Sequence, residues 1–183
     1  RAIPVPVLDL DRLQALPVTG PQPRVLFVGR LAPEKNLMLW LEVAQRIGVE
    51  APAVQFDIVG DGALRASLKA RAGQLGLEGR ITFHGARPRT ELPVIYGRSG
   101  LLLLTSDHEG FGRVLVEAMA AGVPVVSTRT AGAREVLGEG EAGAMAAVGD
   151  AAGLAAAALR LLRDDAARAA AIGVGDDDWV WIA

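Results

Sequence analysis

Cysteine is absent from the 183 residues of this chain, and histidine occurs only twice, as His84 and His108. Disulfide bonds and thiol catalysis are therefore excluded, and two histidines are too few for a histidine-rich metal site. A chain without cysteine suits a reducing compartment, so we expect a cytoplasmic location.

Aromatic residues make up only 4% of the chain, although 51% of its residues are hydrophobic. The core must therefore come from Leu, Val, Ala and Ile, which is typical of layered α/β proteins. A formal net charge of -2 provides no diffuse positive field, so we expect no nucleic-acid partner. No signal-peptide pattern opens the chain, and no apolar run approaches the roughly 20 residues that span a bilayer.

The two ends of the chain differ in composition from the middle. Five prolines interrupt residues 1–23, which predicts an irregular lead-in or an interdomain linker. The chain also begins without Met, so we expect it to be part of a longer protein. Residues 173–183 read GVGDDDWVWIA, and this acidic, tryptophan-containing tail fits neither a helix nor a strand of the preceding domain.

Between these ends, residues 24–172 alternate short apolar runs with segments of helical spacing, which predicts one doubly wound, Rossmann-like parallel sheet with helices on both faces. We expect a Thr90 cap on the third helix and an Asp150 cap on the last one. A short hydrophobic passage lies near 144–148. The predicted strands are 24–29, 54–60, 81–83, 101–105 and 123–127, and the predicted helices are 36–47, 63–75, 90–96, 112–121 and 151–163.

Ligands of an open parallel sheet bind beyond the carboxyl ends of the strands. After the first strand, Gly29 allows backbone to approach a ligand, while Arg30 and Lys35 flank a helix start that favours phosphate. This pattern indicates an anion-binding loop. The alternative is that Arg30 and Lys35 are surface charges that pair with Glu34.

The segments after the second and third strands carry weaker signals. Gly60-Asp61-Gly62 predicts a tight turn that caps the following helix, without a catalytic role. In the segment His84-Gly85-Ala86-Arg87, we interpret the histidine as a packed or capping residue, and Arg87 is a candidate to lie beside a bound base.

The strongest pattern follows residues 101–105. Glu109 stands in a loop, and Glu117 comes eight positions later, within the helix expected to start near Gly112. We expect both carboxylates to face one cleft, where Gly110 and Gly112 expose backbone N–H groups. Glu117 could accept hydrogen bonds there from the two hydroxyls of a ribose. The alternative is an exposed helix residue at 117 and a loop charge at 109.

The segments GRLAPEKN, FHG, SDHEGFGRVLVEAMAAGVPVVST and AGAREVL, in this order, resemble the motifs of retaining glycosyltransferases of family 4, also called group 1. The resemblance covers residues 24–163. It implies a two-domain GT-B hexosyltransferase whose C-terminal domain binds the nucleotide-sugar donor and whose N-terminal domain binds the acceptor. Only the donor half corresponds to this chain, so we expect the 183 residues alone to catalyse no transfer.

The resemblance also implies roles for individual residues. Arg30 and Lys35 would bind the donor diphosphate and stabilise the leaving group without a metal or a cofactor. Glu109 would orient the sugar rather than act as a covalent catalyst, and Glu117 would hold the ribose. The other donor-binding candidates are Gly29, Ala86, Arg87, Gly110, Phe111, Gly112 and Val114.

The motifs are compatible with several donors and with more than one function. The donor is a UDP-, GDP- or ADP-sugar, and any peripheral membrane association would involve only the N-terminal domain. The tail does not resemble the family's closing helix, which puts interdomain closure in doubt. The alternatives are half of a GT-B-like epimerase or phosphorylase and a noncatalytic nucleotide-binding module. An NAD-binding domain is disfavoured, because no G-x-G-x-x-G follows the first strand.

Overall fold

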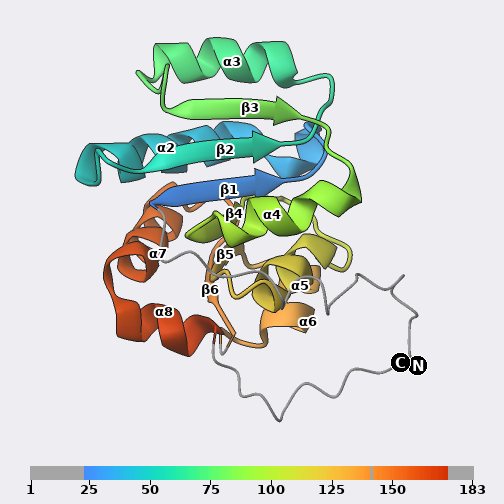
Figure 1. Ribbon diagram of the computed structural model, residues 1–183, viewed down its shortest axis with the longest axis vertical. Helices are drawn as coiled ribbons and strands as arrows, with labels where there is room; N and C mark the ends of the chain where they lie inside the picture. Colours follow the sequence, from blue (N-terminus) through green and yellow to red (C-terminus); the bar gives the residue numbers. More distant parts are fainter. Residues whose placement is uncertain (1–22, 141, 173–183) are drawn as a thin grey trace.

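A computed structural model describes residues 23–140 and 142–172 (Figure 1). The predicted lead-in, except for Pro23, and the predicted acidic tail at 173–183 lie outside these residues. Along the described ranges, no helix combines the length and the apolar character that crossing a bilayer requires.

The described residues form one six-stranded sheet in the order β3-β2-β1-β4-β5-β6, and every strand pair is parallel. The chain leaves β1 in one direction along the sheet and returns to the other side of it with β4. This reversal creates a switch point between β1 and β4, where parallel sheets bind ligands. The strands are β1 (Arg24–Val28), β2 (Gln55–Val59), β3 (Ile81–Gly85), β4 (Leu101–Leu104), β5 (Val125–Thr128) and β6 (Ala144–Ala146).

Helices cover both faces of the sheet, which confirms the predicted doubly wound fold. Helix α2 packs against α3 and α7 on one face, and α4 lies across the opposite face (Figure 1). The helices are α2 (Leu37–Glu50), α3 (Arg65–Gln74), α4 (Leu92–Gly97), α5 (Arg113–Ala120), α6 (Ala131–Leu137), α7 (Ala151–Arg163) and α8 (Asp165–Ile172), with 3-10 turns η1 (Pro33–Lys35) and η2 (Arg89–Glu91).

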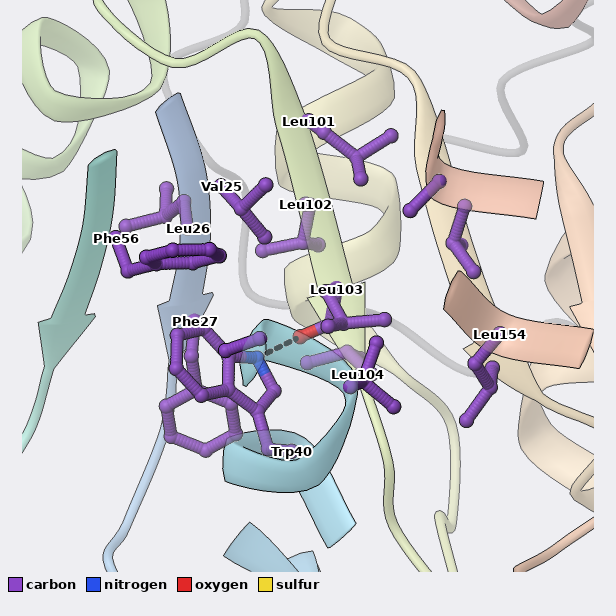
Figure 2. Close-up of a cluster of buried hydrophobic side chains, with 14 of the residues drawn as sticks. Val25, Leu26, Phe27, Trp40, Phe56, Leu101, Leu102, Leu103, Leu104 and Leu154 are labelled. Atoms are coloured by element: carbon purple, nitrogen blue, oxygen red, sulfur yellow. Dashed lines mark hydrogen bonds between the residues drawn. The ribbon is translucent and has the colours of Figure 1, made fainter. Parts of the chain in front are cut away.

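Trp40 of α2 joins the helix layer to the sheet. Its fully buried ring makes edge-on contacts with Phe27 and Phe56, at centroid distances of 6.4 and 6.0 Å. The indole Nε1 donates a hydrogen bond of 3.1 Å to the carbonyl oxygen of Leu103 in β4 (Figure 2). A buried indole needs such a partner, so this bond fixes α2, and the loop that leads into it, against the central strand.

The helix starts agree only partly with the sequence predictions. Asp150 caps α7 as predicted, because its side chain accepts from the backbone N–H of Gly153 at 2.8 Å. The predicted Thr90 cap is wrong: Thr90 lies inside η2, and Glu91 stands at the N-cap of α4. A proline in the first turn of α4 explains the difference, since a proline ring fits there and starts the helix later.

Gly60-Asp61-Gly62 forms a turn, but its predicted capping role is wrong, because Leu64 stands at the N-cap of α3. The two glycines matter for close packing instead. A Cβ on Gly60 would lie 1.8 Å from the carbonyl oxygen of Gly29, and one on Gly62 would lie 2.4 Å from that of Leu31. The loops after β1 and β2 can therefore pack together only without side chains at these positions.

Candidate functional site

The loops that follow β1 and β4 are joined at the switch point by polar contacts. The hydroxyl of Thr105 donates to the carbonyl oxygens of Lys35 and Asn36, at 3.1 and 3.0 Å. The Asn36 amide donates to Asp107 at 2.7 Å, and the Asp107 backbone N–H donates to the Glu34 carbonyl oxygen at 3.0 Å. These bonds hold the loop that carries Lys35 beside the loop that carries Glu109.

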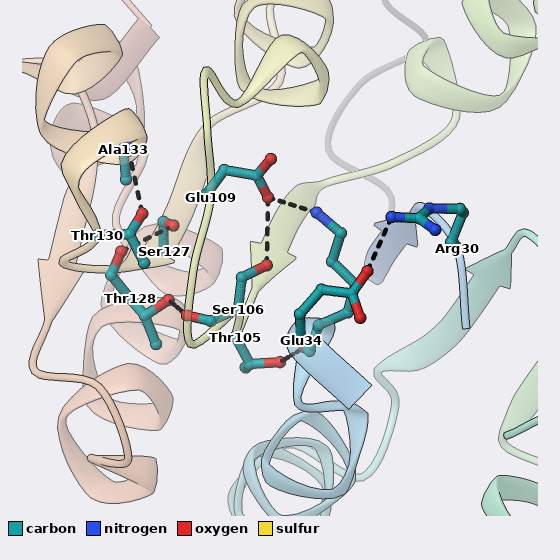
Figure 3. Close-up of polar contacts among 10 residues, drawn as sticks. Arg30, Glu34, Thr105, Ser106, Glu109, Ser127, Thr128, Thr130 and Ala133 are labelled. Atoms are coloured by element: carbon teal, nitrogen blue, oxygen red, sulfur yellow. Dashed lines mark hydrogen bonds and ion pairs between the residues drawn. The ribbon is translucent and has the colours of Figure 1, made fainter. Parts of the chain in front are cut away.

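Lys35 and Glu109 form an ion pair across these loops, although 74 residues separate them in the sequence. The Lys35 Nζ lies 2.6 Å from Oε2 of Glu109, and the two side chains are only 17% and 15% exposed. Ser106 donates to the same carboxylate oxygen at 3.2 Å (Figure 3). The structure thus brings together two of the three predicted catalytic residues in a partly desolvated setting.

Arg30, the third predicted catalytic residue, is not part of this pair. Its side chain is 79% exposed and pairs with Glu34 at 2.8 Å (Figure 3). The alternative of pairing with Glu34 is therefore confirmed for Arg30 and wrong for Lys35. An exposed pair of this kind contributes about 0–1 kcal/mol, so Arg30 can exchange Glu34 for another anion at little cost.

Helix α6 supports the Glu109 loop from its other side. The backbone N–H of Gly132 donates to the Glu109 carbonyl oxygen at 3.1 Å, and a Cβ on Gly132 would lie 2.6 Å from that oxygen. The Thr128 hydroxyl donates to the Ser106 carbonyl oxygen at 2.6 Å, and Thr130 caps α6. These supports were not predicted from the sequence, although the glycine beside the helix start in AGAREVL is a signal for a close backbone approach.

The predicted start of the next helix is confirmed. Gly112 adopts a left-handed conformation, with φ of 68°, and α5 begins at the following residue. A Cβ on Gly112 would lie 2.6 Å from the side chain of Leu115. Around Gly110, by contrast, no atom of the described residues other than its chain neighbours lies within 4 Å of the Cβ position. Phe111 and Val114 are half-buried, and Val114 packs against the core.

Glu117 belongs to a second, buried cluster. It is 7% exposed, and it accepts a hydrogen bond of 2.9 Å from the hydroxyl of Tyr96, which is fully buried in α4. Burial raises the pKa of Glu117, while the bond from Tyr96 and the charges of Arg89 and Arg113 oppose that rise. The alternative of an exposed helix residue at 117 is therefore wrong, and no sequence pattern pointed to Tyr96 as the partner of Glu117.

The loop after β3 places the remaining candidates. Ala86 and Arg87 are exposed, and Arg87 lies 3.5 Å from Glu91. The interpretation of His84 as a packed residue is confirmed, because its Nε2 lies 2.7 Å from the buried carboxylate of Asp57. Within the described ranges, no group of three or more potential metal-ligating side chains is found.

Curated relatives of this chain include several glycosyltransferases. A 2-deoxystreptamine glucosyltransferase from Streptomyces kanamyceticus is 35% identical over 185 residues, which cover 100% of this chain and 46% of that protein. The chain spans less than half the length of this and other curated relatives.

Solved structures share the fold. The crystal structure of Anabaena Alr3699/HepE with UDP and glucose superposes with a TM-score of 0.81 and 26% identity, over 90% of this chain and 48% of that one. The C-terminal domain of a group 1 glycosyl transferase (LpcC) from Francisella tularensis gives a TM-score of 0.74 and 22% identity, over 82% of this chain and 80% of that one.

The family model described as "Glycosyl transferases group 1" matches residues 12–174, which include all the described residues up to 172 and the whole candidate site. The sheet order, the loop contacts at the switch point and this match lead to one assignment. The chain belongs to the group 1 glycosyltransferases and forms a domain of the GT-B type.

Proposed function

We propose that this domain binds the nucleotide-sugar donor of a retaining family 4 glycosyltransferase that works without a metal or a cofactor. A separate N-terminal domain would bind the acceptor. The observation that carries the proposal is the Lys35–Glu109 pair at the switch point between β1 and β4, where a lysine and a carboxylate lie in reach of one ligand. UDP and glucose in the HepE structure support a nucleotide-sugar ligand.

In this proposal, Lys35 and Arg30 bind the diphosphate. Lys35 exchanges Glu109 for a phosphate oxygen, and Arg30 turns from Glu34 to the same anion. Their charges stabilise the negative charge that develops on the leaving nucleoside diphosphate. The bond from the anomeric carbon to the phosphate oxygen breaks as the acceptor oxygen bonds on the same face, and the acceptor proton passes to the leaving phosphate.

Glu109, once separated from Lys35, would accept hydrogen bonds from sugar hydroxyls and orient the ring. Its loop is held by Ser106 and by Gly132, so the carboxylate starts from a defined position. A fixed carboxylate loses less entropy on binding than a mobile one. We therefore assign Glu109 an orienting role.

The nucleoside part of the donor would lie along the start of α5 and the loop after β3. Backbone N–H groups of 110–112 would contact it there, and Glu117 would hold the ribose. Ala86 and Arg87 are exposed, as residues that border a base must be. Gly29 and Val114 would shape the floor of the site.

Calorimetry on the 183-residue chain tests the proposal. UDP is the first ligand to test, followed by GDP and ADP and their glucose conjugates. We expect one of these diphosphates to bind, and Lys35→Met to weaken that binding at least about tenfold through loss of a charged hydrogen bond. Lys69→Met, which removes a lysine on α3 beside Phe83, is the matched control. Binding that is equal in wild type and Lys35→Met would contradict the assignment.

A further inference from the structure

Tyr96 and Glu117 join two helices on the same face of the sheet. Tyr96 comes from α4, which follows β3, and Glu117 comes from α5, which follows β4 (Figure 1). The hydroxyl of Tyr96 donates to Oε2 of Glu117 at 2.9 Å, and the tyrosine side chain is 0% exposed. Phenylalanine would fill the same volume, so the hydroxyl is the part of this side chain that packing alone does not explain.

The direction of this hydrogen bond is fixed. Burial, together with the nearby Glu117 carboxylate, raises the pKa of Tyr96 well above its usual value, so the hydroxyl keeps its proton and donates. Glu117 is then the acceptor, and the bond favours its ionised form against the effect of burial. Arg89 from η2 and Arg113 in the first turn of α5 act in the same direction.

An ionised carboxylate has two oxygens and about four acceptor sites. Tyr96 occupies one site on Oε2 and thereby fixes the rotation of the carboxylate plane. The remaining sites, including both on Oε1, keep a constant direction relative to α5. A group held in this way can accept from two neighbouring hydroxyls without first losing rotational freedom.

We propose that Tyr96 is the positioning residue of the nucleoside end of the site: its hydroxyl orients Glu117 so that the carboxylate accepts from the ribose 2′- and 3′-hydroxyls and selects ribonucleotides over 2′-deoxyribonucleotides. This inference rests on the proposed donor-binding function. It adds a residue to that site and a specificity that follows from the residue.

The test compares UDP with 2′-deoxy-UDP on the whole chain by calorimetry, at neutral pH and at about pH 5.5, one unit above the ordinary carboxyl pKa. Wild type should prefer UDP. Tyr96→Phe should reduce the preference for UDP over 2′-deoxy-UDP about three- to tenfold, which is the range that one hydrogen bond supports. The reduction should come mainly from weaker binding of UDP. The reduction should be larger at the lower pH, because Glu117 without its donor takes up a proton more readily.

Two further variants separate positioning from folding. Glu117→Gln should abolish the preference, and adding Tyr96→Phe to it should then change little, because the two residues act through one contact. Glu117→Asp keeps the charge but withdraws it by one methylene, and it should reduce the preference for UDP over 2′-deoxy-UDP as Tyr96→Phe does. Thermal unfolding of each variant with UDP present confirms that it is folded.

The outcomes are distinguishable. If Tyr96→Phe weakens both nucleotides equally and to the same extent at both pH values, Tyr96 only supports the fold and the inference is wrong. If wild type binds UDP but does not distinguish its 2′-deoxy form, donor binding stands and the ribose role fails. If wild type binds no nucleoside diphosphate, the proposed function fails and this inference fails with it.

Discussion

Replacing Glu109 by Gln should tighten the binding of UDP. In the structure, the Lys35 ammonium is already paired with Glu109 at 2.6 Å, and both side chains are mostly buried. A diphosphate that binds Lys35 must therefore compete with a resident carboxylate. Glutamine keeps the size of the side chain and one acceptor oxygen, but it removes the negative charge that competes with the phosphate and repels it.

The size of the effect follows from the kind of hydrogen bond that is lost. A bond between two charged groups contributes about 1.5–3 kcal/mol, and one to a neutral acceptor contributes about 0.5–1.5 kcal/mol. The change from Glu to Gln should thus release about 1–1.5 kcal/mol of competition, which corresponds to roughly five- to tenfold tighter binding. A fully exposed pair would give far less, and here the exposed fractions of 17% and 15% favour the larger value.

Calorimetric titration with UDP and with UDP-glucose measures this effect. The gain should appear for UDP and should be smaller or reversed for UDP-glucose, because Glu109 would also lose its contact with the sugar. Lys35→Met should remove the gain when it is combined with Glu109→Gln. Unchanged or weaker UDP binding by Glu109→Gln would refute the reasoning, because Glu109 would then not compete for Lys35.

Three further changes test the scaffold. Gly132→Ala places a methyl 2.6 Å from the Glu109 carbonyl oxygen, so it should lower the free energy of unfolding by about 1–3 kcal/mol and weaken the binding of UDP. Gly73→Ala is the control and should do neither, because, among the described residues, the space around the added methyl on α3 is open. Denaturant titration measures the free energy of unfolding, and calorimetry measures the affinity for UDP. If Gly132→Ala and Gly73→Ala behave alike, the close contact between Gly132 and the Glu109 carbonyl does not matter for stability or binding. Trp40→Phe removes a buried hydrogen bond to the Leu103 carbonyl and part of a ring, so we expect the free energy of unfolding to fall by about 1–3 kcal/mol. Urea titration measures this change, and a loss below about 0.5 kcal/mol would show that the bond contributes little to stability. Glu117→Gln should raise the free energy of unfolding at neutral pH, because the raised pKa of Glu117 makes its ionised form costly there. The difference in this free energy between the variant and wild type should shrink as pH falls toward 4.5, the ordinary pKa of a glutamate side chain. A difference that grows as pH falls would mean that folding lowers the pKa of Glu117.

The sheet could be predicted from the sequence because its strands carry an unmistakable signal. Residues 101–104 are four consecutive leucines, all buried, and a short apolar run of this kind is typical of a central strand of a parallel sheet. Strand β6 was harder, since Ala144–Ala146 has no β-branched residue and lies at the sheet edge. Its strand character depends on pairing with β5, which composition does not reveal.

The candidate site was predictable in its residues and less so in its pairings. Lys35, Glu109 and Glu117 stand out by motif, but the partner of each is set by how distant loops meet. Tyr96 carries no signal of its own, because an aromatic residue in a short helix reads as core. Gly132 matters only because another backbone comes within 2.6 Å of its Cβ position, a fact of tertiary packing.

The long sequence separation of Lys35 and Glu109 also sets an order on folding. The strands β1, β2 and β3 can pair with one another before the chain has reached β4, because each follows the last through a local crossover. The lysine is therefore present early, but its carboxylate partner arrives only when β4 docks beside β1. Nucleotide binding during refolding would accordingly mark the docking of β4 against β1, rather than the pairing of β1 with β2 and β3.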